Sequence, residues 1–156
     1  MALLAPGEQD KLRESFNEMT APVRLLFFTQ TIDCEPCVQT RQILDELPPL
    51  SDKISIEEVN LVLEGDKAKQ YGVDRVPAIA LVSLENGQAD RGAGAPGVIR
   101  DSRIRFLGTP AGYEFISLIQ AILLVGGRPP GLTQENHKRL AAVNKPLTMQ
   151  VFTTPT

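Results

Sequence analysis

The chain has only two cysteines, Cys34 and Cys37, and their position in the sequence constrains the fold more than any other feature. A nearly continuous apolar run, residues 23–29, precedes this Cys-x-x-Cys motif, and a helix-like pattern extends from it to about Leu47. The motif therefore lies where a buried strand passes into a helix. At a helix N-terminus, unpaired backbone N–H groups and the positive end of the dipole favour the thiolate form of a cysteine.

This placement indicates redox chemistry. A thiolate is the nucleophile in disulfide exchange, and a second nearby thiol can resolve the mixed disulfide that the first one forms. We predict that Cys34 is the nucleophile and the more exposed, more acidic thiol, and that Cys37 is the resolving thiol. A purely stabilising bridge is a poorer explanation, because so short a loop constrains the unfolded chain little. A zinc site is poorer still, because only His137 could join the pair, whereas zinc needs about three or four protein ligands.

Length and charge narrow the class of protein. The 156 residues suffice for one domain with its own core, and a net charge of −3 does not suggest binding to nucleic acid or to an anionic membrane. Residues 1–7 lack the basic start of a secretory signal, and no apolar run approaches the roughly 20 residues of a membrane span. Two cysteines are not the framework of a small secreted domain. We therefore expect a cytoplasmic protein.

Apolar periodicity and helix-breaking residues predict an α/β domain. An amphipathic helix at about residues 8–19 precedes the first strand, and a second strand at residues 54–60 completes a right-handed βαβ unit. A helix ending on Gly72 and a strand at residues 78–84 follow. An Asn86-Gly87 turn and a Gly-rich loop at residues 88–102 lead to an antiparallel strand at residues 103–107. The last helix of this unit extends from an N-cap at Thr109 to about Val125.

The order of these elements resembles the thioredoxin fold: a four-stranded mixed sheet of a βαβ and a ββα unit, flanked by helices, here with an extra N-terminal helix. Residues 68–77, which end in Val76-Pro77, are similar to the family segment that leads into a cis-proline facing the cysteines. Residues 105–115 are similar to the first unit of the two-unit, glutaredoxin-like protein disulfide oxidoreductases of prokaryotes.

The resemblance implies an enzyme, a thiol–disulfide oxidoreductase that acts on protein disulfides. No cofactor is needed, because the electrons reside on the sulfurs, and a flavin-dependent disulfide reductase using a nicotinamide is the implied partner. Pro77 would form a cis bond and shape the substrate groove. Ile32, Pro36 and Val76 would line an apolar patch for extended substrates. The alternative function is a binding or chaperone-like module with little redox turnover, which a buried Cys34 sulfur would favour.

The chain also departs from the families it resembles. It has no tryptophan, so the Trp-Cys-Gly-Pro-Cys motif of thioredoxins is absent, and Phe28 stands where they carry a buried aspartate. Asp33 and Glu35 flank Cys34, either as solvated residues or as tuning residues that disfavour its thiolate. If they tune Cys34, the reduction potential of the pair should be nearer that of thioredoxin, about −270 mV, than that of the strong disulfide oxidants, about −120 mV. Arg41 is best interpreted as part of a solvated helix face.

Composition changes near the end, so we divide the chain into a redox domain, residues 1–127, and a tail, residues 128–156. Thr133 could cap a helix that extends to about Val143, and residues 147–153 have a strand pattern. In the two-unit family the corresponding strand opens a second unit, so the tail would belong to a truncated or missing one. A lone strand leaves its backbone unpaired, so it must join the edge of this domain's sheet, pair with a second molecule or stay disordered. We expect one of the two pairings, and pairing between two molecules would give a homodimer.

Overall fold

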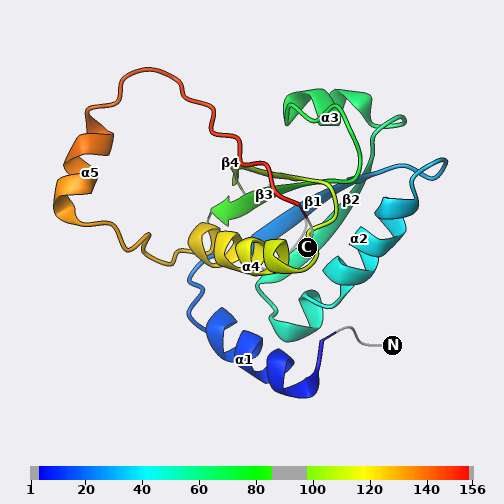
Figure 1. Cartoon of the computed structure of the whole chain (residues 1–156), viewed down its shortest axis with the longest axis horizontal. Helices are drawn as coiled ribbons and strands as arrows, with labels where there is room; N and C mark the ends of the chain where they lie inside the picture. Colours follow the sequence, from blue (N-terminus) through cyan, green and yellow to red (C-terminus); the bar gives the residue numbers. More distant parts are fainter. Residues whose placement is uncertain (1–3, 86–97, 155–156) are drawn as a thin grey trace.

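A four-stranded mixed sheet forms the centre of the computed structural model, which describes residues 4–85 and 98–154 (Figure 1). Its order is β2-β1-β3-β4; β1 and β2 are parallel, and β3 is antiparallel to both β1 and β4. The strands are β1 Val23–Thr29, β2 Ile54–Asn60, β3 Ala78–Glu85 and β4 Val98–Leu107. The predicted βαβ and ββα units of the thioredoxin fold are confirmed.

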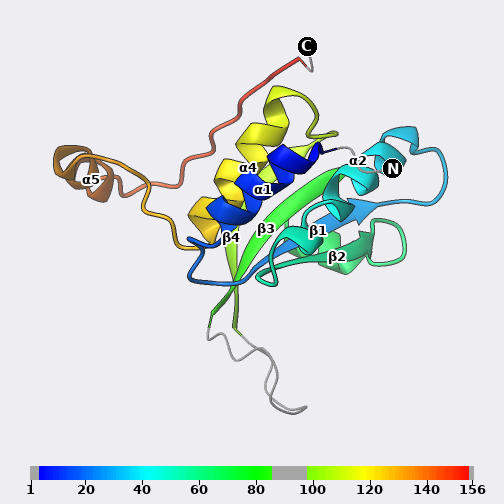
Figure 2. The same cartoon turned by 90° about the horizontal axis from the view of Figure 1, so that it is seen from below.

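Helices cover both faces of this sheet (Figure 2). They are α1 Pro6–Phe16, α2 Glu35–Asp45, the 3₁₀ turn η1 Pro48–Leu50, α3 Gly65–Gln70, α4 Tyr113–Val125 and α5 Gln134–Ala141. The first of them is the expected extra N-terminal helix. Within residues 4–85 and 98–154, no helix is long and apolar enough to cross a membrane.

Strand β1 is buried on both sides, which explains its nearly continuous apolar sequence. Leu25 and Phe27 point into a larger core cluster shared with α1, α2 and α4. Leu26 and Phe28 point into a smaller cluster on the opposite face, which α3 and the residues after it cover. Since only residues 30–34 separate β1 from α2, this packing limits where α2 can begin.

A charged side chain closes the smaller cluster from the edge of the sheet. The Arg105 guanidinium lies 5.6 Å from the centre of the Tyr71 ring and donates a hydrogen bond to the Tyr71 carbonyl at 3.0 Å. It also binds the Asp101 carboxylate at 2.6 and 2.8 Å, and this hydrogen bonding lowers the pKa of Asp101. Strand β4 is thereby tied to the end of α3, where the segment leading to Pro77 begins.

Strand β4 is longer than predicted, because residues 98–102 belong to the strand and not to the Gly-rich loop. The predicted turn at residues 86–87 and loop residues 88–97 lie outside the described residues. The register of β3 and β4 shifts between Ala80 and Val82, Arg103 has a φ of 64°, and the Ser102 hydroxyl donates to the Leu81 carbonyl at 2.6 Å. This bulge interrupts the alternation by which a strand is recognised in sequence.

The start of α4 also differs from the prediction. The helix begins at Tyr113, and its N-cap is Gly112, which has a φ of 58°. The sequence predicts Thr109 as the cap, but the hydroxyl of this residue hydrogen-bonds α2 instead. A Thr-Pro pair is a common helix start, and the sequence carries no sign that a residue from a distant helix claims this hydroxyl.

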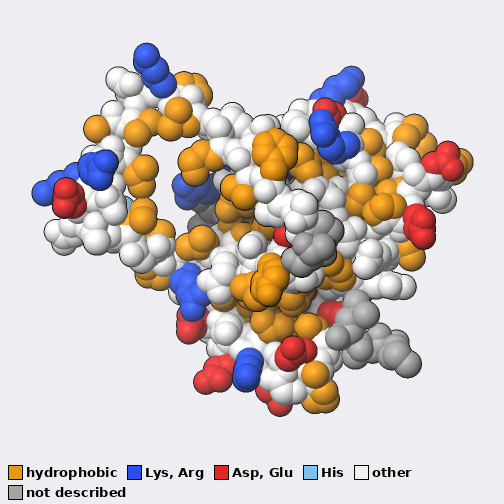
Figure 3. All heavy atoms as spheres, viewed as in Figure 1, with side chains coloured by type: hydrophobic (Ala, Val, Ile, Leu, Met, Phe, Trp, Pro, Cys, Tyr) orange, Lys and Arg blue, Asp and Glu red, His pale blue; other side chains and the backbone are white. Residues whose placement is uncertain are grey.

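The tail extends away from the body of the domain and returns to it near the start of α4 (Figure 1). Thr133 caps α5 as predicted, accepting a hydrogen bond from the Asn136 N–H at 3.2 Å. Residues 147–153 are exposed coil and not a strand, so the predicted pairing with this domain's own sheet edge is wrong. Where the chain returns, the Thr153 hydroxyl hydrogen-bonds the Glu114 carboxylate, and Figure 3 shows an opening between the tail and the body.

Candidate active site

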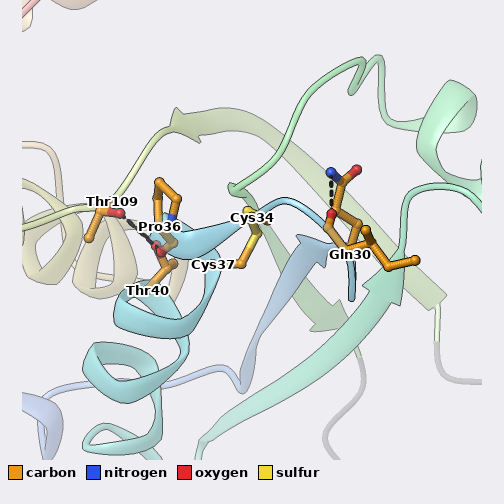
Figure 4. The surroundings of a disulfide bond; sticks show 7 residues. Gln30, Cys34, Pro36, Cys37, Thr40 and Thr109 are labelled. Atoms are coloured by element: carbon orange, nitrogen blue, oxygen red, sulfur yellow. Dashed lines mark hydrogen bonds between the residues drawn. A yellow bond between two sulfur atoms is a disulfide. The ribbon is translucent and has the colours of Figure 1, made fainter.

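Cys34 and Cys37 form a disulfide at the N-terminus of α2, directly beyond the end of β1 (Figure 4). Their Cα atoms are 5.3 Å apart. Cys34 is the N-cap of the helix and is partly exposed, whereas Cys37 lies in the first turn and is only 4% exposed. The structure confirms the predicted position of the pair and the predicted difference in exposure.

The first turn of α2 lacks one backbone donor. Pro36 occupies the second helical position and has no N–H group. The next N–H along the chain, that of Cys37, binds the Cys34 carbonyl at 3.2 Å. Upstream, Asp33 has a left-handed φ of 58°, and the Gln30 side-chain amide donates to the Ile32 carbonyl at 2.9 Å. These local bonds hold the loop that turns from β1 into the helix.

Two threonines that the sequence does not predict as part of the site support this turn from inside. The Thr40 hydroxyl donates to the Pro36 carbonyl at 2.8 Å, and Thr40 is fully buried. The Thr109 hydroxyl lies 2.9 Å from the Thr40 hydroxyl and 3.3 Å from the Pro36 carbonyl oxygen. A threonine three residues after Cys37 is the only sign of this cluster in the sequence, because Thr109 lies 69 residues from Thr40 along the chain.

The Val76–Pro77 bond is cis, as predicted. Pro77 is buried, and its carbonyl accepts a hydrogen bond from the Gly108 N–H at 2.8 Å. Val76 is partly buried and packs against the larger core cluster, as does Cys34. The structure thus brings the Val76-Pro77 segment and the cysteine motif to the same part of the core.

Exposed apolar side chains lie in the cysteine loop and at the same end of the sheet. Ile32 is 74% exposed, and Pro36 is exposed as well. Val62 and Leu63, which the sequence pattern does not single out, are also exposed in the turn after β2. Because Thr29 pairs with Asn60 at the ends of parallel strands, this turn leaves the sheet at the same end as the cysteine loop.

Of the charged residues near the motif in sequence, Asp33 and Glu35 are exposed beside Cys34. Arg41 is half-exposed and forms ion pairs with Asp45, at 2.8 Å, and with Glu58 on β2. The hydrogen bond with Asp45 is the main cause of its raised pKa. Arg41 therefore links α2 to the sheet, which goes beyond the solvated helix face that the sequence suggested.

The described residues contain no group of three histidine, cysteine or acidic side chains that could hold a metal ion. His137, the one residue considered as a partner for the cysteines, is exposed on α5, which projects away from the body (Figure 1). The groups that the structure brings together at the site are the cysteine pair, the N-terminus of α2 and exposed apolar side chains.

No family model matches the chain. Among curated proteins, the chain is 31% identical over 93 residues to an NADH dehydrogenase of Bacillus subtilis, a match that covers 60% of this chain and 13% of the relative. It is 36% identical over 76 residues to a probable thioredoxin of Methanothermobacter marburgensis, covering 48% of this chain and 82% of the relative. The chain thus spans about an eighth of the length of the dehydrogenase and most of the thioredoxin.

Two solved structures that superpose on this chain are also redox proteins. The N-terminal domain of the alkyl hydroperoxide reductase AhpF from Enterococcus faecalis superposes with a TM-score of 0.74 and 27% identity, over 91% of this chain and 62% of that one. A protein disulfide oxidoreductase from Aeropyrum pernix superposes with a TM-score of 0.68 over 88% of this chain and 54% of that one. Its 22% identity supports a shared fold only.

Proposed function

This chain belongs to the thioredoxin family of thiol–disulfide oxidoreductases, and from that premise we propose that it exchanges disulfides with protein substrates. The observation that carries the proposal is the unequal exposure of the two cysteines at the start of α2. A partly exposed Cys34 is within reach of a substrate disulfide, and a buried Cys37 is protected from one. The alternative of a binding module with little turnover would be favoured by a buried Cys34.

The proposed reaction transfers two electrons between pairs of sulfur atoms. In the reduced protein, the Cys34 thiolate attacks a substrate disulfide, which breaks the substrate S–S bond, forms a mixed disulfide and releases one substrate thiolate. Cys37 then gives up its proton to the leaving thiolate and attacks the Cys34 sulfur. The second substrate thiol leaves, and the Cys34–Cys37 disulfide closes. The reverse sequence oxidises a substrate dithiol.

We propose that substrates bind along the apolar surface around the motif. In this proposal the exposed Ile32 and Pro36 form the cysteine side, the partly buried Val76 and the buried Pro77 form the segment facing it, and the exposed Leu63 extends the surface beyond β2. Exposed apolar side chains next to a reactive group are suited to extended, partly unfolded protein segments. No resident cofactor is part of this proposal.

The reductant that we propose is a flavin-dependent disulfide reductase using a nicotinamide, acting in the cytoplasm. The support comes from two longer relatives, the NADH dehydrogenase of Bacillus subtilis and an alkyl hydroperoxide reductase of Escherichia coli, of which this chain matches 13% and 19% of the length. A short match within a longer reductase is compatible with a thioredoxin-like unit that passes electrons on.

Reduction of insulin by dithiothreitol tests the proposed activity. The chain should accelerate precipitation of the reduced insulin chains over the dithiothreitol background, and the alkylated protein should not. A chain that binds unfolded insulin without accelerating its reduction would instead support the binding module.

We predict that Glu35→Gln raises the reduction potential by up to about 20 mV, because an exposed charge contributes at most about 1 kcal/mol and about 30 mV corresponds to 1.4 kcal/mol. Removing a negative charge beside Cys34 favours its thiolate and hence the reduced form. Equilibration against glutathione measures the potential, and Glu8→Gln on α1 is the matched control. The shift should shrink in high salt. No shift at low salt would show that Glu35 is only a solvated residue.

We propose that residues 128–156 form a linker, the helix α5 and a segment, residues 147–153, that is coil in the single chain and becomes a strand only when it pairs with another molecule, beside a redox domain of residues 1–127. Leu147, Met149, Val151 and Phe152 are 73–89% exposed, which is costly in water. We expect this segment to pair with the tail or sheet edge of a second copy, giving a homodimer. Light scattering should show that deleting residues 145–156 halves the molecular mass. An intact chain that is already monomeric contradicts this prediction.

A further inference from the structure

Three oxygen atoms lie close together beside the first turn of α2: the carbonyl oxygen of Pro36 and the hydroxyl oxygens of Thr40 and Thr109 (Figure 4). The carbonyl lies 2.8 Å from the Thr40 hydroxyl and 3.3 Å from the Thr109 hydroxyl, which are 2.9 Å apart. Because each hydroxyl carries one proton and a carbonyl carries none, the chain of donors ends on the Pro36 oxygen. Thr40 is fully buried, so water does not replace these bonds.

The Pro36 carbonyl belongs to the same peptide group as the Cys37 N–H. Hydrogen bonds accepted by a carbonyl polarise its peptide and make the N–H at the other end a stronger donor. Pro36 itself has no N–H, so the Cys37 N–H is the donor that follows it in this turn. In the disulfide form the Cys37 N–H donates to the Cys34 carbonyl at 3.2 Å, and in the reduced form the thiolate of the same residue would compete for it.

The same cluster also joins the two sides of the proposed substrate groove. Thr109 follows Gly108, whose N–H binds the Pro77 carbonyl at 2.8 Å. The Pro77 segment is thereby connected, through Gly108 and Thr109, to the first turn of α2. A change in the position of this turn on reduction is resisted from the Pro77 side.

We propose that Thr40 and Thr109 are positioning residues that favour the reduced state of the Cys34–Cys37 pair. They make the Cys37 N–H a stronger hydrogen-bond donor to the Cys34 thiolate, and they hold the first turn of α2 against the Pro77 segment. Neither threonine reacts; both act through the Pro36 peptide. This inference deepens the proposed function and rests on it, since it assigns residues that help to set the reduction potential of the same cysteine pair.

Thr40→Val and Thr109→Val test the inference, because valine keeps the shape of threonine and removes the hydroxyl. We expect the equilibrium constant for reduction of the disulfide by glutathione to fall about two- to tenfold in each variant, the range expected for loss of one hydrogen bond. A tenfold fall corresponds to about 30 mV. The thiolate absorbance of the reduced variants should develop at higher pH. Thr109→Ser, which retains the hydroxyl, should restore both values.

Thr20→Val is the matched control, because the Thr20 hydroxyl donates to the Gly126 carbonyl at 3.3 Å, at the far end of α4. It should lower stability without changing the equilibrium with glutathione. If the two threonines are only structural, Thr109→Val will lower the free energy of unfolding in urea equally for the oxidised and reduced forms. The equilibrium constant for reduction by glutathione will then be unchanged, which would overturn the inference. A constant that rises would overturn it as well.

The half-buried position of Thr109 keeps the test available if Thr40→Val does not fold. The measurement also separates this inference from the proposed function. Equilibration with glutathione requires only a redox-active cysteine pair, so a wild-type chain that fails to reduce insulin would count against the proposed function and leave the comparison of threonine variants intact.

Discussion

Replacing Cys34 by serine is expected to abolish insulin reduction, whereas Cys37→Ser is expected to stop the reaction halfway and trap substrate on Cys34. The partly exposed Cys34 makes the first bond to substrate, so without it no mixed disulfide forms. In Cys37→Ser the first step remains possible, but no second thiol breaks the mixed disulfide. Turnover should fall to the dithiothreitol background in both variants, although for different reasons.

Mass spectrometry distinguishes the two outcomes. Incubated with glutathione disulfide, Cys37→Ser should carry one glutathione adduct on Cys34, and Cys34→Ser should carry little, because its remaining thiol is 4% exposed in the native chain. Limiting alkylation of the reduced wild-type chain should label Cys34 first. Preferential labelling of Cys37, or an adduct formed more readily in Cys34→Ser, would reverse the assigned roles.

The parts of the fold that the sequence predicts best are those set by local physics. The continuous apolar run of β1 follows from burial on both faces, and Gly72, which has a φ of 66°, ends α3 as its position indicated. The cis bond before Pro77 could be predicted only from the resemblance to a family, because X–Pro bonds are mostly trans.

The errors arise where distant residues decide the local structure. The bulge at Arg103 makes the first half of β4 hard to recognise in the sequence. The strand's alternation of inward and outward side chains is interrupted there, where its register with β3 shifts. Thr109 has the pattern of a helix cap, yet it serves α2, which precedes it by many residues. Residues 147–153 have a strand's alternation, but alternation alone forms no strand without a neighbour to pair with.

The second large effect is expected for Phe28→Ala, which should lower the free energy of unfolding by about 3–5 kcal/mol. Phe28 is completely buried on β1, and its ring lies 6.2 Å from that of Tyr71 in a tilted arrangement. Urea unfolding of the oxidised protein measures the change. Phe28→Leu is the control, because a large apolar side chain refills most of the space, at a cost of less than about 1.5 kcal/mol.

The loss should be near the upper end of this range because the surrounding cluster cannot fill the cavity. Ala68, Ala78 and Ala80 line this side of the sheet and are too small to reach into the vacated space. The cluster also underlies the route from Tyr71 to Pro77, and Phe28 pairs directly with Ala78, the residue after Pro77.

Phe28→Ala should therefore impair insulin reduction even at temperatures where the variant remains folded, since the Pro77 side of the groove loses its support. The comparison that isolates this effect is the activity of Phe28→Ala and Phe28→Leu under conditions where urea titration shows both to be native. A stability loss below about 1 kcal/mol would mean that α3 moves inward and closes the cavity. In that case the groove would shift with it, and activity would be the more sensitive readout of the two.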